Sequence, residues 1–228
     1  MDAHLLRSHN PYLPPLASVA PELQDYVNAV IEVVPVLADS LMEFARYFAG
    51  VLVNQYSKRT SEQNAQFLVL CIFDVQIYQL SRHFRESLQD EAIAANLAGA
   101  VLFQALGRTP QCDDQNIFLG LSYRLRGSDK YAAAARIFSY TTEPVGTTFG
   151  REFAQLLYGR TTEDVVMLGT SKLLAVGLYT DANIRGILFG EEFGDEARAR
   201  VEATCADQDR KTTQAIQEWR RRNPTAGY

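Results

Sequence analysis

The chain has 228 residues, of which 47% are hydrophobic and 21% are charged, and its formal net charge is −5. One hydrophobic core can organise a chain of this length, and the apolar fraction is far above that of disordered chains. The negative charge excludes a surface that is basic throughout, as a purely electrostatic nucleic-acid binder would have. We therefore predict a single folded domain.

The three cysteines, Cys71, Cys112 and Cys205, are far apart and form no Cys-x-x-Cys pair. This spacing indicates neither a disulfide framework nor a zinc site, so we expect a reducing, cytoplasmic protein without a metal or cofactor. The first residues lack the basic and apolar regions of a secretory signal. The most apolar run, residues 67–80, contains Asp74 and is shorter than the ~20 apolar residues of a membrane-spanning helix, so no membrane association is expected.

Prolines at positions 11, 14 and 15 remove backbone donors and favour an extended chain. We therefore predict an extended arm over residues 1–20. Its apolar side chains can be buried only against a folded surface, which its own domain or a neighbouring subunit would supply. These side chains are Leu5, Leu6, Tyr12, Leu13 and Leu16.

A helical apolar period begins after Pro21 and continues to about Tyr56. Pro21 suits a first helical turn, where its missing N–H is no loss. Pro35, in contrast, lacks a needed N–H and clashes with the preceding turn. We predict that the first helix ends or kinks at Pro35 and that a second amphipathic segment follows.

The next predicted helix begins after the N-cap Ser61 and continues through Phe84. It is apolar on nearly every side, which is typical of a helix at the centre of a fold. We predict that six of its side chains belong to the core: Phe67, Leu70, Cys71, Phe73, Ile77 and Leu80.

Capping residues then delimit several shorter helices. Asp90 is a good N-cap for a helix that Gly107 ends, and Gly159 and Gly190 are placed to end two later ones. Thr162, followed by two acids, is placed to open another. The predicted ranges after Gly107 are 113–125, 128–140, 148–158, 162–176 and 181–190.

The last predicted helix, residues 195–222, is polar, with a thin apolar seam that includes Val201 and Trp219. A seam this narrow suits a groove or a partner helix better than a central core. The sequence thus predicts an all-α protein of about 8–10 helices. Its parts are the arm 1–20, a helical core domain 21–194 and the charged C-terminal helix and tail 195–228.

One polar cluster in the helical core could form a ligand pocket. His83 and Glu86 lie three residues apart on one helix face, and Asp74 is the single acid in the most apolar helix. A carboxylate in so apolar a helix needs a hydrogen-bond or charge partner, because burial without one raises its pKa. Ion pairing of His83 with Arg82, Arg85 and Glu86 is the structural alternative.

A second cluster combines basic and aromatic residues, the types that contact phosphate and stack on bases. It consists of Tyr123, Arg124, Arg126, Lys130 and Tyr131. Arg151 follows a glycine- and threonine-containing helix start, where free N–H groups attract anions. A solvated helix junction is the structural alternative for both.

No catalytic set can be assembled from the sequence, whereas both chain ends are suited to contact a partner. We therefore expect a non-enzymatic helical scaffold or interaction protein, a homo-oligomer that self-associates through its terminal segments. One alternative is an oligomeric, nucleocapsid-like RNA-binding protein. A second alternative is a helical enzyme or small-ligand binder that uses the pocket at Asp74, His83 and Glu86.

Overall fold

A computed structural model describes residues 10, 12–56, 62–106 and 148–224. These residues form two 3-10 turns and six α-helices and contain no strand, which confirms the all-α prediction. In chain order the elements are η1 (Leu16–Ser18), η2 (Pro21–Leu23), α2 (Gln24–Tyr56), α3 (Glu62–Leu88), α4 (Glu91–Leu106), α7 (Thr148–Tyr158), α8 (Glu163–Phe189) and α9 (Asp195–Arg222). The predicted helices at 113–125 and 128–140, together with Cys112, lie outside the described residues.

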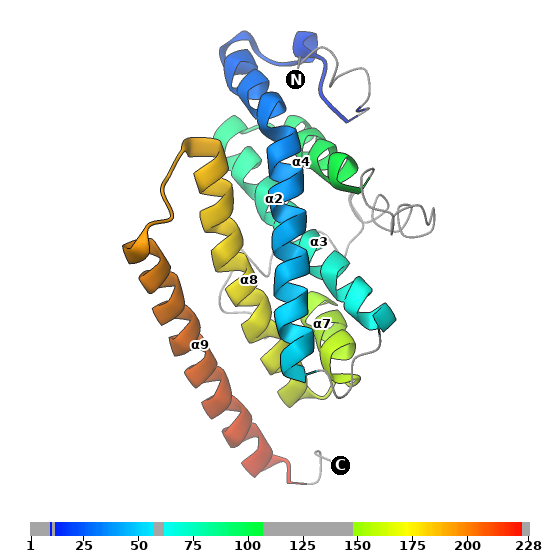
Figure 1. Ribbon diagram of the computed structural model, residues 1–228, viewed down its shortest axis with the longest axis vertical. Coiled ribbons are helices and arrows are strands. Elements are labelled where there is room, and N and C mark those ends of the chain that lie inside the picture. The colour runs from blue at the N-terminus through cyan, green and yellow to red at the C-terminus, as the bar shows by residue number, and fades with distance from the viewer. Residues whose placement is uncertain (1–9, 11, 57–61, 107–147, 225–228) are drawn as a thin grey trace.

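The helices form one compact body with α9 on its outside (Figure 1). α3 packs against α2, α4, α7 and α8, and so lies among four other helices, as expected of a core helix. The long helices α2 and α8 also contact each other. α9 lies along α8, which is the one described helix against which it packs extensively.

The core prediction for α3 is largely confirmed. Phe73, Ile77 and Leu80 are completely buried, Cys71 is buried, and Leu70 packs against the core from a partly buried position. The side chain of Phe67 lies outside the described part of the chain. α3 also buries polar residues, among them Gln76, Gln79 and His83, which follow one another at helical spacing and so share a face.

The predicted helix end at Pro35 is wrong. α2 continues through this proline as one helix of 33 residues. An interior proline costs a helix about 3 kcal/mol. The turns on both sides of Pro35 bury Ile31, Val34 and Leu37 in the core. Tertiary packing of this apolar face outweighs the local cost.

The predicted break between residues 176 and 181 is also wrong, since α8 is continuous from Glu163 to Phe189. Val176 and Gly177 are buried in the middle of the helix. Asp181, which could have capped a new helix, instead bonds to His83 across the α3–α8 interface. Packing against α3 therefore holds the segment in one helix.

The capping predictions for Asp90, Gly159 and Gly190 are confirmed, and Thr162 precedes α8 as predicted, but its hydroxyl donates to the Asp164 carboxylate and not to the backbone. The Asp90 carboxylate accepts hydrogen bonds from the N–H groups of Ala92 (2.9 Å) and Ile93 (3.0 Å) at the start of α4. Gly159 and Gly190 end α7 and α8 with φ of +66° and +67°, a left-handed conformation that glycine adopts without strain.

The end of the N-terminal arm docks on its own domain. Asn10 is buried and donates a hydrogen bond to the carbonyl of Ala100 (2.8 Å) in α4. The rings of Tyr12 and Phe103 lie 5.9 Å apart, and Leu13 packs against the core. Leu5 and Leu6, and the side chain of Leu16, lie outside what the structure describes.

α8 is long and apolar enough, by length and composition, to cross a membrane, but half of its most apolar window is buried inside this structure. It packs against α2, α3, α7 and α9 and carries Lys172 and Arg185, both of which form ion pairs. These contacts are typical of the core helix of a helical bundle.

Gly169 marks a close approach of α7 and α8. A Cβ there would lie 3.1 Å from the carbonyl oxygen of Gly150 and 3.2 Å from the backbone nitrogen of Ala154. We expect Gly169→Ala to destabilise the protein by about 1–3 kcal/mol, because overpacking exceeds the ~1 kcal/mol gain in helix propensity. Gly50→Ala is the matched control: Gly50 is exposed in α2 with nothing within 4 Å, so alanine should stabilise by about 0.5–1 kcal/mol. Urea denaturation would measure both changes, and equal stability of the two variants would contradict the close approach.

Candidate functional site

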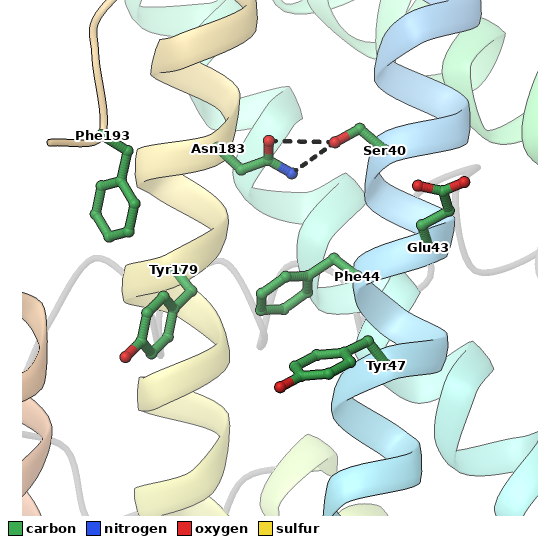
Figure 2. Close-up of a pocket in the computed structure, with 7 residues that line it drawn as sticks. All are labelled: Ser40, Glu43, Phe44, Tyr47, Tyr179, Asn183 and Phe193. Atoms are coloured by element: carbon green, nitrogen blue, oxygen red, sulfur yellow. Dashed lines mark hydrogen bonds between the residues drawn. The ribbon is translucent and has the colours of Figure 1, made fainter. Parts of the chain in front are cut away.

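An open hollow of about 420 Å³ lies between α2 and α8, beside the linker to α9 (Figure 2). We call it the aromatic groove, because four of its seven lining residues are aromatic. The lining residues are Ser40, Glu43, Phe44, Tyr47, Tyr179, Asn183 and Phe193.

Helical spacing explains why these side chains meet. The four groove residues of α2 follow one another at intervals of three, one and three residues and therefore share a face of that helix. Tyr179 and Asn183 lie one turn apart on α8. Phe193 comes from the linker that begins at Gly190, where the left-handed backbone redirects the chain after α8.

The rings on the groove wall support one another. Phe44 lies 6.4 Å from Tyr179, and Tyr179 meets the edge of Phe193 at 6.2 Å, measured between ring centroids. Both arrangements are within the range that aromatic pairs prefer. Tyr47 is 71% exposed, so its ring is available to a ligand.

A hydrogen-bonded pair closes one end of the groove, as Figure 2 shows. Ser40 Oγ lies 3.2 Å from Asn183 Oδ1, and Asn183 Nδ2 donates to Ser40 Oγ at 3.0 Å. Glu43, also at the groove, is exposed and forms no ion pair within the described residues. The α2 side of the groove thus contributes an exposed carboxylate and an exposed aromatic ring, and in Figure 2 the Glu43 carboxylate points away from the Tyr47 ring.

The surroundings of the groove are negative. Phe193 lies in the segment Gly190-Glu191-Glu192-Phe193-Gly194-Asp195-Glu196, which carries four acids and no basic residue. Burial is the main reason that the pKa of Tyr179 is raised; the charge of Glu202 raises this pKa as well, whereas that of Arg198 lowers it. The groove therefore favours positively charged groups.

This arrangement is suited to binding. Aromatic faces attract apolar groups and cations, and a carboxylate beside them selects the cation. Within residues 12–56, 62–106 and 148–224, no three His, Cys, Asp or Glu side chains gather as metal ligands would.

Of the predicted ligand pocket, the structure describes the side chains of His83 and Glu86, which have different partners. His83 is buried, and its Nε2 lies 2.8 Å from Asp181 Oδ1 of α8. Glu86 is exposed and pairs with Arg82 at 3.0 Å. Asp74 lies in α3, but its side chain is outside the described part of the structure. His83 and Glu86 therefore belong to different contacts.

The His83–Asp181 pair extends into a small network. Arg185 Nε lies 3.2 Å from Asp181 Oδ2, and its guanidinium also reaches Glu191 at 3.3 Å. The hydrogen bond with His83, above all, holds the pKa of Asp181 below its ordinary value, and the charge of Arg185 acts in the same direction. This network joins α3, α8 and the linker after α8, so its role in the structure is packing.

The predicted phosphate-binding site stays a prediction, because the structure describes only one of its residues. Arg151 is exposed on α7. Tyr123, Arg124, Arg126, Lys130 and Tyr131 all lie outside the described residues.

Sequence reasoning missed the aromatic groove because its two sides are more than a hundred residues apart. One local signal was present: Glu43 and Tyr47 are exposed on α2 next to the half-buried Phe44 and Phe48. A second was Phe193, an apolar residue among four acids. Neither signal indicates that these residues of α2 and Phe193 lie at the same groove, or that α8 lies between them in the fold.

No protein-family model, curated protein or solved structure matches this chain. Inferences about its function therefore rest on the structure of the chain itself.

Proposed function

We propose that the protein is a non-enzymatic helical interaction protein that self-associates through its C-terminal helix. The observation that carries this proposal is the position of α9. Of its 28 residues only Thr212 and Ile216 are buried, and the helix lies on the outside of the body (Figure 1). Such a helix adds little to the core, and most of its surface is free to contact a second copy.

Polar contacts hold α9 in a defined position on α8. At its C-terminal end, the indole N–H of Trp219 donates to Glu163 (2.7 Å), and Arg220 Nη2 lies 2.7 Å from Asp164 Oδ2. Near its middle, Asp209 accepts hydrogen bonds from Ser171 and Lys172. The helix is therefore presented in a fixed orientation.

The apolar seam of α9 is used within the chain. Ile216 is buried, Val201 is half-buried, and Trp219 bonds to Glu163 of α8. In our proposal Val201 and Trp219 support self-association indirectly, by holding α9 in place. The direct contact uses the charged ends of the helix.

The charges of α9 are segregated along its length. Asp195 and Glu196 lie in the first turn, whereas Arg220, Arg221 and Arg222 lie in the last. Arg220 is engaged with Asp164, whereas Arg221 and Arg222 are exposed and Arg222 makes only a long ion pair of 3.9 Å with Glu218 of the same helix. We call Arg221 and Arg222 the arginine end. Opposite charges at the two ends of an exposed helix favour contact between copies.

The N-terminal arm is the weaker candidate for this contact. Its described residues Tyr12 and Leu13 pack on α4 and the core of the same chain. Its role in self-association, including that of Leu5, Leu6 and Leu16, stays a prediction.

Reversal of charge at the arginine end tests the proposal. We expect Arg221→Glu/Arg222→Glu to lower the mass of the protein in sedimentation velocity at micromolar concentration, because the end then repels the acidic surface it contacts. Higher salt should lower the wild-type mass in the same way. The matched control is Arg210→Glu/Lys211→Glu, which makes the same charge change in the middle of α9. It should keep the wild-type mass, and circular dichroism should show equal helix content in both variants.

A wild-type monomer at micromolar concentration would overturn the proposal, as would loss of mass in both double variants alike. The absorbance ratio of the purified protein supplies a second readout. Oligomers that form only with bound nucleic acid would replace this proposal with the RNA-binding alternative.

A further inference from the structure

The aromatic groove and the arginine end have complementary chemistry. The groove offers the exposed ring of Tyr47, three further rings and the carboxylate of Glu43, which forms no ion pair with the described residues. An arginine side chain can stack its planar guanidinium on an aromatic face and donate hydrogen bonds to a carboxylate at the same time. Its aliphatic stem is buried well by aromatic side chains.

We infer that the aromatic groove receives the arginine end, Arg221 and Arg222, of a second copy of the chain. This inference rests on the proposed self-association and names the surface that accepts the helix. The support is charge complementarity: Glu43 lines the groove, and Glu191 and Glu192 of the adjoining linker precede two further acids in the first turn of α9, whereas the last turn of α9 carries three arginines.

The same chain cannot supply its own arginine end in this geometry. Arg220 is bound to Asp164 and Trp219 to Glu163, both in the first turn of α8. The groove, in contrast, uses Tyr179 and Asn183, which lie about four to five turns further along α8. The arginine end that occupies the groove therefore comes from another copy.

The contact is head to tail, since groove and arginine end are different surfaces of one chain. Contacts of this kind produce rings or open filaments. They also allow a groove-deficient copy and an arginine-deficient copy to complement each other, because the pair still contains one intact groove and one intact arginine end.

The first experiment removes the groove ring. We expect Tyr47→Ala to weaken self-association about five- to tenfold in sedimentation velocity, a loss typical of a partly desolvated cation–π contact. Glu43→Gln should weaken it as well and reduce its salt dependence. Phe189→Ala is the matched control, since it removes a 46% exposed aromatic ring of α8 that does not line the groove. This control should keep the wild-type association within about twofold.

The second experiment mixes Tyr47→Ala with Arg221→Glu/Arg222→Glu, one of them fluorescently labelled. Each variant alone should associate more weakly than the wild type, and at a concentration where each alone is largely monomeric the mixture should form a heterodimer. A mixture that associates no more than its components would overturn the inference. If the arginine variant dissociates while Tyr47→Ala keeps the wild-type mass, the groove inference fails and the proposed self-association stands. A monomeric wild type would overturn both.

Discussion

Replacement of Phe73 by alanine should lower the free energy of unfolding by about 3–5 kcal/mol. Phe73 is completely buried in α3, the helix that contacts α2, α4, α7 and α8. Deletion of its ring removes apolar contacts and leaves a cavity that four surrounding helices cannot readily fill. Urea denaturation followed by circular dichroism would measure the change.

Two further variants make this result specific. Phe73→Leu keeps most of the buried volume, so its cost should be clearly smaller than that of alanine. Phe189→Ala deletes the same ring from a 46% exposed position and should change stability little. A loss under about 1 kcal/mol for Phe73→Ala would contradict a central position of α3.

Local signals predicted much of the fold. The apolar period identified α2, α3, α4, α7, α8 and α9, and the capping residues Asp90, Gly159 and Gly190 lie at helix ends as expected. These features depend on residues within one or two turns. A sequence read without relatives contains that information directly.

The errors arose where distant contacts override local preference. Pro35 and Asp181 are both local break signals, yet α2 and α8 continue through them because their apolar faces are buried against other helices. His83 illustrates the same limit. Its partner is Asp181, 98 residues away in sequence, and local spacing offered Glu86 instead.

The aromatic groove could not be predicted because it requires the pairing of α2 with α8. Helical periodicity shows that a residue such as Tyr47 lies on a given face, but not which helix that face approaches. Nothing in the spacing of Tyr179 and Phe193 relates them to α2. The pairing is decided by the core side chains between these helices.

Replacement of Asp164 by alanine should destabilise the protein by about 1–3 kcal/mol at neutral pH, since hydrogen bonds to charged groups are among the stronger ones. The Asp164 side chain is 5% exposed, accepts a hydrogen bond from the Thr162 hydroxyl (2.7 Å) and binds the Arg220 guanidinium of α9. Arg220 is 58% exposed, so water can solvate its guanidinium in the variant. The loss of stability is therefore smaller than for an ion pair whose remaining charge is left buried without a partner. Denaturation in urea would measure the effect. Asp207→Ala, which removes the solvent-exposed ion pairs with Arg210 and Lys211 within α9, is the control and should have little effect.

The dependence of this loss on pH identifies its source. Burial alone would raise the pKa of Asp164, but the hydrogen bonds from Thr162 and Arg220 and the charge of Arg220 outweigh it and lower the pKa below 3.8. A carboxylate whose folded pKa is depressed contributes stability above its unfolded pKa and loses that contribution as the pH falls through the folded value. The difference between the wild type and Asp164→Ala should therefore be largest near pH 7 and should shrink at the acid end, below about pH 4. A difference that stays constant to low pH would show that Asp164 stabilises α9 on α8 by shape and not by charge.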